Sequence, residues 1–382
     1  MSPATSILGL SMTCARVEPL PRDTVVRELM RPLAGFLDIP GATEVSVNRT
    51  GEVFVEVGPV WERHEVPSLT IARLVSMAQA IATFTDQELS PQKPILSAIL
   101  PGGQRIQIVV PPVVEPEMIS FSIRLPSAAI RSLDDYRAEG AFDRFVWARP
   151  AGQGAHAQDV DVTDRHLMAM LEANDLVSFF DAAVKAKKNF AIVGETGSGK
   201  TTLMKSICQA IPVEERIITI EDVRELFLPR HPNSVHLLYS KGDQGVARVS
   251  PAQLIASTMR MKPDRVLLAE LRGSEAFDFL KLLTTGHSGS VTSFHAESCR
   301  LAAERYVFMC KEHEDAESYD SDALKALVKL TIDIIVHVTA RTTQNSAGLR
   351  KERYVSEVHF DPVAKLNARF DQAPLHHAGT RP

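Results

Sequence analysis

Hydrophobic and polar residues alternate with a period of two in the first third of the chain. The segment EVSVNRTGEVFVEV (residues 44–57) contains two alternating runs around Thr50-Gly51, and ILSAILPGGQRIQIVV (residues 95–110) contains two more around Gly102-Gly103. Such alternation predicts strands with one buried face, and a glycine between two short runs predicts a hairpin turn. We therefore expect two β-hairpins here.

A helical pattern and a further strand complete this part of the chain. Residues 68–84, SLTIARLVSMAQAIATF, repeat their apolar positions with the period of a helix, and MISFSIRLP (residues 118–126) alternates again. Strands without intervening crossover helices favour an antiparallel sheet. We assign residues 1–145 to an N-terminal antiparallel α+β domain.

The pattern changes after a segment with little apolar periodicity. RPAGQGAHAQDVD (residues 149–161) has the composition of a linker, and we place the linker at residues 146–165. Beyond it, the apolar runs FAIVG, RIITIED, RVLLAE and GSVTSF alternate with helical patterns. This alternation predicts a second domain over residues 166–382, an α/β fold with a mostly parallel sheet covered by helices.

A glycine-rich sequence links the first of these strands to a helix. GETGSGKTT (residues 194–202) matches the pattern G-x-x-x-x-G-K-T in the context strand, loop, helix. Backbone N–H groups and the positive end of the helix would hold a polyphosphate, with Lys200 on its β and γ phosphates and the Thr201 hydroxyl as a ligand of Mg²⁺. The predicted nucleotide-binding residues are Gly194, Glu195, Thr196, Gly197, Ser198, Gly199, Lys200, Thr201 and Thr202.

Two other predicted strands end in carboxylates. RIITIED ends with Glu221 and Asp222, and RVLLAE ends with Glu270. Ligands of parallel sheets lie beyond the carboxyl ends of the strands. Beside a phosphate loop, one acid can hold the hydrated Mg²⁺ while another orients and polarises the attacking water. Without that loop, a solvated acid would be the better explanation of Glu270, and a turn cap would explain Glu221 and Asp222 equally well.

Two histidines bracket the last strand. His287 and His295 lie eight positions apart in TTGHSGSVTSFHAES, which is about 26 Å in a continuous strand at roughly 3.3 Å per residue. They cannot share one metal. Either can donate to a γ-phosphate, although a loop histidine is more often a hydrogen-bonded bystander.

Composition argues against several classes of protein. The net charge is −5, which gives no general basic character for nucleic-acid binding. The four cysteines form no C-x-x-C pair, so neither a zinc ribbon nor a disulfide framework is indicated. This cysteine usage is consistent with a protein of the reducing cytosol. The most apolar window, LKALVKLTIDIIVHV, is interrupted by Lys325, Lys329 and Asp333, so we expect no transmembrane segment. No N-K-x-D sequence supports guanine recognition.

Taken in order, these motifs resemble the secretion ATPase superfamily, specifically the traffic ATPases of type IV secretion systems of the VirB11 type. The resemblance covers nearly the whole chain. It rests on GETGSGKTT as Walker A, ITIEDVREL as the Asp box, RVLLAELRGSEA as an atypical Walker B and TTGHSGSVTSFHAES as the His box. In the N-terminal half, SAILPGGQRIQIVVPP and ISFSIRLPS resemble the segments that supply arginines to the nucleotide.

The resemblance implies a RecA-like C-terminal domain and a cytoplasmic homo-hexamer that hydrolyses Mg-ATP to power pilus assembly and substrate export. Glu270 matches the Walker B acid that acts on Mg²⁺ through water, and Glu221 would polarise the nucleophile. His295 would contact the γ-phosphate, with His287 in support. The implied partners are inner-membrane components of the secretion system, which would hold the protein peripherally at the membrane, and indirectly the exported protein or DNA–protein substrates.

Two arginines have a further argument from strand geometry. Arg105 and Gln107 share one face of their predicted strand, and Ser122 and Arg124 share one face of theirs, opposite the apolar residues. A solvated face is the simpler interpretation from the residues alone. The resemblance makes Arg105 and Arg124 candidate phosphate clamps, for which a planar guanidinium is well suited.

Three alternatives remain open from the sequence. Type II secretion and pilus motor ATPases share the four C-terminal motifs. A nucleic-acid translocase would use the same core with a basic channel or stacking aromatic residues. A non-hydrolysing ATP-gated scaffold would need the phosphate loop but neither Glu221 nor Glu270, and both are present.

Overall fold

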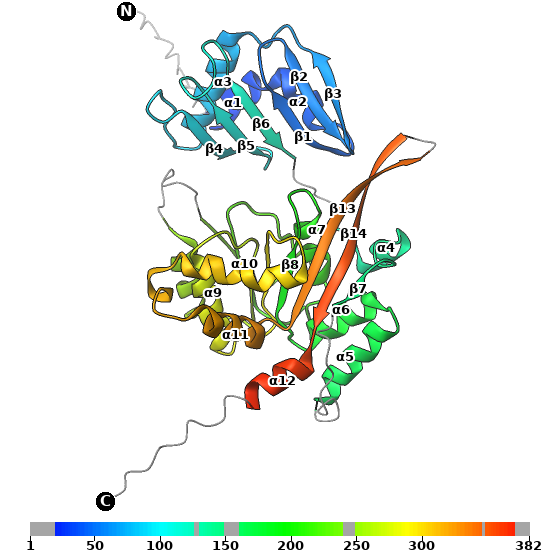
Figure 1. Ribbon diagram of the computed structural model, residues 1–382. Helices are drawn as coiled ribbons and strands as arrows, with labels where there is room; N and C mark the ends of the chain where they lie inside the picture. The colour runs from blue at the N-terminus through cyan, green and yellow to red at the C-terminus, as the bar shows by residue number, and fades with distance from the viewer. Residues whose placement is uncertain (1–19, 126–129, 149–159, 240–248, 346–347, 371–382) are drawn as a thin grey trace, which may run out of the picture.

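The computed structural model describes residues 20–125, 130–148, 160–239, 249–345 and 348–370. Most of the segment expected as the linker, residues 149–159, lies outside these ranges. Two sheets, each with its own helices, form two separate units (Figure 1). This agrees with the expected fold class, a smaller antiparallel α+β unit followed by a larger α/β unit.

The first unit is a six-stranded antiparallel sheet in the order β3-β2-β1-β6-β5-β4. Its elements are α1 (Thr24–Leu29), α2 (Arg31–Leu37), β1 (Ala42–Val47), β2 (Glu52–Val57), β3 (Val60–Glu65), α3 (Ile71–Phe84), β4 (Ile95–Ile99), β5 (Arg105–Val109) and β6 (Ser120–Arg124). Both predicted hairpins are confirmed as β1–β2 and β4–β5. The edge strand β3 and helices α1 and α2 were not predicted.

The core of this sheet forms because alternate residues point to one side. Ile106 and Ile108 of β5 and Phe121 and Ile123 of β6 are buried in one cluster with residues of α3. Arg105 and Gln107 point to the other side and are only partly buried, while Arg124 is exposed. The sheet therefore carries the polar face that the sequence predicted.

The second unit is an eight-stranded sheet in the order β10-β9-β11-β12-β8-β13-β14-β7. Its strands are β7 (Val146–Trp147), β8 (Phe190–Val193), β9 (Ile217–Glu221), β10 (Ser234–Leu238), β11 (Arg265–Leu268), β12 (Val291–Phe294), β13 (Ile334–Asn345) and β14 (Gly348–Phe360). Its helices are α4 (Leu133–Ala138), α5 (Val162–Glu172), α6 (Leu176–Lys185), α7 (Lys200–Cys208), α8 (Pro251–Thr258), α9 (Glu275–Thr284), α10 (Cys299–Lys311), α11 (Ser321–Thr331), α12 (Pro362–Phe370) and the 3₁₀ helix η1 (Glu314–Ala316).

The centre of the second sheet is parallel and buried on both faces. Every residue of β8, β9, β11 and β12 is buried, as expected for strands covered on two sides. Residues of α5, α6 and α7 join one core cluster, and residues of α8, α9, α10 and α11 join the other. The parallel arrangement places the loops after β8, β9, β11 and β12 at the same edge of the sheet.

An antiparallel ribbon extends the parallel sheet. β13 pairs with β8 in parallel and with β14 over its whole length in antiparallel fashion. Figure 1 shows this ribbon running beyond the rest of its sheet toward the first unit. This long hairpin was not predicted from the sequence, because its outer half is polar and packs against no core that would produce alternation.

The boundary between the units differs from the one expected at residue 145. Leu133, Tyr136 and Phe142 are buried in a core cluster of the second unit, and β7 pairs with β14. The first sheet ends with β6 at Arg124. We therefore propose a domain boundary between Leu125 and Ile130.

Two expectations from composition can be compared with the described residues. In those ranges no helix has both the length and the apolar character to cross a membrane. Cys208, Cys299 and Cys310 are buried free thiols.

Candidate active site

The phosphate loop lies between β8 and α7 and depends on its glycines. Gly197 and Gly199 have φ values of +74° and +99°, a region that favours residues without Cβ, and Gly199 directly precedes α7. A Cβ at Gly194 would lie 2.0 Å from the carbonyl oxygen of Val338 on β13. The loop therefore keeps its shape only with glycine at these positions.

The Lys200 ammonium is folded back onto its own loop. It donates to the carbonyl oxygens of Gly194 at 2.9 Å and Glu195 at 2.8 Å. Burial lowers the pKa of Lys200 to about 8; the charge of Glu270 opposes this shift, while the charges of Arg124 and Arg272 add to it. An anionic phosphate in contact with Lys200 would restore its ordinary basicity, so the site favours a phosphate ligand.

The other loop residues divide into an exposed and a buried set. Glu195 and Thr196 are exposed, and Thr201 and Thr202 are half-buried in the first turn of α7. Ser198 is 1% exposed, and its hydroxyl has no hydrogen-bond partner among the described residues. A buried hydroxyl without a partner is costly, so this group is well suited to bind a ligand oxygen.

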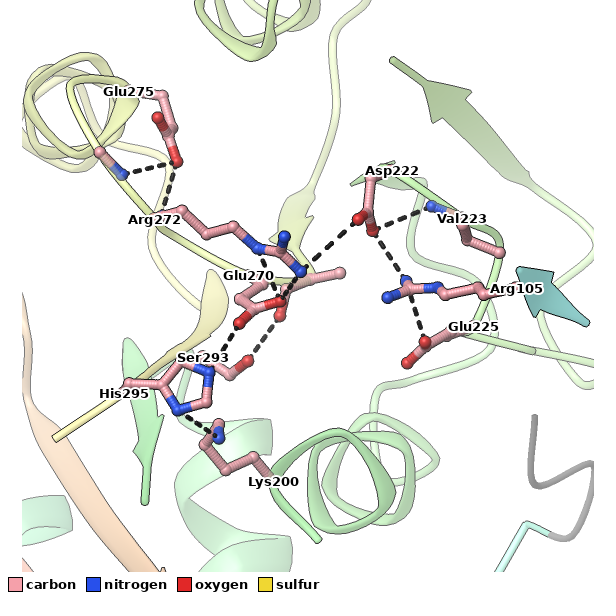
Figure 2. A network of polar contacts seen from close by, with 12 residues as sticks. Arg105, Lys200, Asp222, Val223, Glu225, Glu270, Arg272, Glu275, Ser293 and His295 are labelled. Atoms are coloured by element: carbon pink, nitrogen blue, oxygen red, sulfur yellow. Dashed lines mark hydrogen bonds and ion pairs between the residues drawn. The ribbon is translucent and has the colours of Figure 1, made fainter. Parts of the chain in front are cut away.

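Glu270 lies beyond the end of β11 and is held from two sides (Figure 2). Its Oε1 lies 3.2 Å from Nε2 of His295. Its Oε2 accepts hydrogen bonds from Nε of Arg272, at 2.9 Å, and from Nη2 of the same guanidinium. The carboxylate is therefore fixed at the edge of the sheet where the phosphate loop begins.

His295 joins Glu270 to the phosphate-loop lysine. Its Nδ1 lies 3.2 Å from the Lys200 ammonium, on the side opposite to Glu270. Burial lowers the pKa of His295, and the positive charge of Lys200 lowers it further. Nδ1 also lies 3.2 Å from the carbonyl oxygen of Gly194, which itself accepts from Lys200. The neutral tautomer protonated at Nε2 donates to Glu270 and accepts from Lys200.

His287 does not lie at this edge, contrary to the expectation of a supporting role at the nucleotide. It precedes β12, whose first residue pairs with Phe190 at the start of β8, whereas the phosphate loop follows the end of β8. The His287 ring contacts the hydroxyl of Thr285 at 3.1 Å. The two histidines bracket one parallel strand, so they lie at opposite edges of the sheet.

Glu221 is inside the protein rather than at the surface of the site. Its side chain is 0% exposed, and Oε2 accepts the backbone N–H groups of Glu225 at 2.7 Å and Leu226 at 2.8 Å. Its Oε1 accepts the hydroxyl of Thr219 at 2.8 Å, with Nδ1 of His236 at 3.4 Å. These contacts fix the loop after β9. The role of polarising the nucleophile, expected for Glu221, has no support in this geometry.

The arginines of the first unit reach the same edge. Nη2 of Arg105 lies 2.8 Å from Asp222 and 2.9 Å from Glu225, both on the loop after β9. Arg124 is directly opposite Arg105 in the β5–β6 register. Its charge is one of those that lower the pKa of Lys200. The polar face of the first sheet is therefore turned toward the phosphate loop.

Several site residues were missed by sequence reasoning. Arg272 follows Glu270 by two positions, so its place in the motif was the available signal; Asp222 was noted beside Glu221 but was given no role of its own. Arg353 on β14 donates from Nε to the carbonyl of Gly197 at 3.1 Å, and Nζ of Lys351 lies 3.6 Å from a Cβ built at that glycine. No local pattern marks these two cations.

The donors present fit a magnesium ion shared with a nucleotide. Within the described ranges, no group of three or more His, Cys, Asp and Glu side chains forms a metal site by itself. The Thr201 hydroxyl and the Glu270 carboxylate supply the oxygen donors that Mg²⁺ takes alongside water and phosphate. The buried Ser198 hydroxyl of the same loop, which has no hydrogen-bond partner among the described residues, fits the phosphate that such an ion accompanies.

Comparisons with known proteins identify the family of the chain. A family profile described as "Type II/IV secretion system protein" matches residues 159–362. The type IV secretion system protein VirB11 of Brucella suis biovar 1 is 45% identical over 338 residues, which cover 88% of this chain and 90% of that protein. VirB11 of Bartonella henselae is 38% identical over 346 residues, covering 90% of this chain and 95% of the relative.

A solved structure adds the fold. The VirB11 ATPase from the Brucella suis type IV secretion system, crystallised in complex with sulphate, is 44% identical and has a TM-score of 0.51. The alignment covers 91% of this chain and 98% of that one. By sequence, fold and motif set, the chain belongs to the VirB11 family of type IV secretion ATPases.

Proposed function

We propose that the chain hydrolyses Mg-ATP between its two domains to power a type IV secretion system. The observation that carries this proposal is one continuous set of contacts. Lys200, His295 and Glu270 are linked in series by separations of 3.2 Å, and an arginine from the other domain ends beside them on Asp222. This arrangement combines a lysine that can bind phosphate, a carboxylate that can orient a water molecule, and an arginine that can move with the first domain.

Each residue has a distinct task in this proposal. The phosphate-loop N–H groups and Lys200 bind the β and γ phosphates, and the Thr201 hydroxyl and Glu270, through water, hold Mg²⁺. When bound, Mg²⁺ neutralises charge on the phosphates and orients them for in-line attack. Glu270 orients the attacking water. His295, neutral near pH 7 because its pKa is lowered, donates to the γ-phosphate from the nitrogen that otherwise contacts Glu270.

The first domain supplies the clamp. Arg105 and Arg124 would move onto the phosphates when the domains close, and a guanidinium can bind two phosphate oxygens at once. We assign Glu221 the task of holding the loop of Asp222 and Glu225 rather than the task of polarising water. Hydrolysis would then be linked to domain rotation.

The assembly belongs to the proposal as well. We propose a homo-hexamer in the cytoplasm that binds inner-membrane components of the secretion system and acts through them on exported substrates. The membership in the VirB11 family supports this assignment. In such a ring, contacts between neighbouring subunits that hold the two domains together would make the specific activity depend on protein concentration.

The first experiment measures Mg-ATP hydrolysis per subunit over a range of protein concentrations, with Lys200→Ala as the blank. We expect activity that rises with concentration, is lost with EDTA and falls to the blank in the variant. Activity equal in the two proteins would refute the hydrolytic site. A constant specific activity would refute the dependence on a ring.

Arg124→Ala tests the clamp in the same assay. We expect slower turnover with an unchanged melting temperature, since the side chain is exposed and is not part of a core. Unchanged turnover would contradict the clamp.

A further inference from the structure

The contacts drawn in Figure 2 continue beyond the residues used by the proposed mechanism. Glu270 is bound to Arg272, Arg272 faces Asp222, and Asp222 is bound to Arg105 of the first domain. We propose that Arg272 is a positioning residue, which orients the Glu270 carboxylate and, through Asp222, couples it to the position of the first domain. This inference rests on the hydrolytic role proposed for Glu270.

Arg272 restricts the orientation of the Glu270 carboxylate. Arg272 directs Nε and Nη2 at the same oxygen, Oε2, and leaves Oε1 to His295. The two donors of Arg272 hold Oε2 even when His295 turns from Oε1 to a γ-phosphate, so the carboxylate keeps one favoured rotation. A carboxylate that must aim a water molecule needs such a constraint, because small errors in orientation slow the reaction.

The backbone of Arg272 is itself held in place by Glu275. Its backbone N–H donates to Oε1 of Glu275 at 2.7 Å, and the N–H of Gly273 donates to the same oxygen at 3.2 Å. Glu275 is the first residue of α9, so the loop after β11 is tied to a helix. The guanidinium therefore extends from a fixed backbone, and its direction depends on its two anionic neighbours.

Asp222 lies between two arginines from different domains. Its Oδ2 is 3.6 Å from Nη2 of Arg272, and its Oδ1 is 2.8 Å from Nη2 of Arg105. The Asp222 side chain is only 8% exposed, and Oδ1 also accepts the N–H of Val223 at 3.0 Å. Charges at these separations, partly shielded from water, interact strongly.

Coupling follows from the sharing of charge. While Arg105 is in place, Asp222 divides its attraction between two cations. When Arg105 leaves Asp222, the attraction of Asp222 for Arg272 changes, and the orientation of the Glu270 carboxylate changes with it. A free-energy coupling of this kind is reciprocal, so a change at Glu270 also affects the position of Arg105.

The test is steady-state ATP hydrolysis by the full chain carrying Arg272→Gln or Arg272→Lys. We expect Arg272→Gln to lower kcat by about 10- to 100-fold with a change in KM below about threefold, as for residues that position a catalytic group. Arg272→Lys keeps the charge and should recover part of kcat. Arg31→Gln, an exposed arginine in α2, is the matched control and should have wild-type kinetics.

The link between the domains is tested by a double-mutant cycle. Asp222→Asn keeps an oxygen for the N–H of Val223 but removes the charge through which Arg105 acts on Arg272. In that background, Arg105→Ala should have a smaller effect on kcat than in the wild type. Effects that simply multiply would overturn the link, even if Arg272→Gln proved too unstable to assay.

The two proposals fail in different ways. A wild type no more active than Lys200→Ala would overturn the proposed function, and this inference with it. An active wild type with an equally active Arg272→Gln variant would overturn only the positioning role. A variant whose KM rises while kcat is unchanged would place Arg272 in substrate binding and would also overturn it.

Discussion

The variant Glu221→Gln tests whether the Glu221 carboxylate stabilises the loop after β9 or activates the attacking water. The carboxylate is fully buried and accepts two backbone N–H groups and the Thr219 hydroxyl. The change to glutamine keeps the shape and one carbonyl oxygen while it removes the negative charge. If Glu221 holds the loop of Asp222 and Glu225, the main loss should be stability. If it activates water, the main loss should be turnover.

The magnitude follows from the hydrogen bonds. Bonds to a charged acceptor contribute about 1.5–3 kcal/mol each, and bonds to a neutral one about 0.5–1.5 kcal/mol. Glutamine can keep both N–H contacts as neutral bonds, so each loses about 1 kcal/mol. The free energy of unfolding should therefore fall by about 2 kcal/mol. Turnover should fall only modestly, whereas loss of a general base would lower kcat by about 10²- to 10⁴-fold.

The pH dependence gives a second, independent reading. Burial alone would raise the pKa of Glu221, but the hydrogen bonds from His236, Glu225, Leu226 and Thr219 outweigh it and lower the pKa below its usual 4.5. The folded state thus prefers the charged form. Its contribution to stability is complete above the unfolded pKa and is lost as pH falls through the folded value. The difference between wild type and Glu221→Gln should shrink as the pH is lowered below about 4.5.

Urea unfolding can be measured for the second domain alone, because the two tryptophans lie in different domains. Trp61 is in β3 and Trp147 is in β7, where its indole donates to the carbonyl of Phe360 at 3.0 Å. In a Trp61→Phe background, fluorescence reports Trp147. An unchanged urea midpoint together with a kcat lowered by more than about 100-fold would refute the structural role of Glu221.

Two further changes test the phosphate loop. Gly194→Ala places a methyl group 2.0 Å from the Val338 carbonyl, so we expect a lower melting temperature and loss of binding of a fluorescent ATP analogue; Gly35→Ala in α2, where a Cβ meets nothing within 4 Å, is the control and should be neutral or stabilising. Retained binding by Gly194→Ala would contradict the close approach. Arg353→Ala removes the donor to Gly197 and should weaken ATP-analogue binding by about 3- to 10-fold. Arg341→Ala on the neighbouring strand is its control, and equal affinities for the two variants would count against a role for Arg353.

The site residues whose position in the fold agrees with the sequence prediction depend on local backbone geometry. The phosphate loop is specified by glycines with positive φ between a strand and a helix, and all of these features are close in sequence. Glu270 was placed correctly at the edge because it ends an apolar run in a parallel sheet. Short-range rules are sufficient for such features.

The errors arise where the direction of a side chain decides its role. Glu221 and Asp222 are neighbours in sequence, yet Glu221 is enclosed by its own loop while Asp222 contacts an arginine 117 residues away. A strand alternates its side chains, and the residue at which the alternation ends is not visible in the sequence. His287 and His295 show the same difficulty. They belong to one sequence motif, but strand β12 between them places them at opposite edges of the sheet.

Contacts between the two domains were the least predictable from the sequence. They involve the polar face of the first sheet. On the sequence alone, Arg105 on a polar strand face is most simply a solvated residue. In the structure its side chain is only 25% exposed, and it contacts two acids of the other domain. Removing a guanidinium from water without a partner would be unfavourable, so these acids make its position possible. Because the same acids lie on the loop held by Glu221 and one of them faces Arg272, any displacement of the first domain changes the charges around Glu270. The domain interface and the chemistry are therefore parts of one electrostatic arrangement.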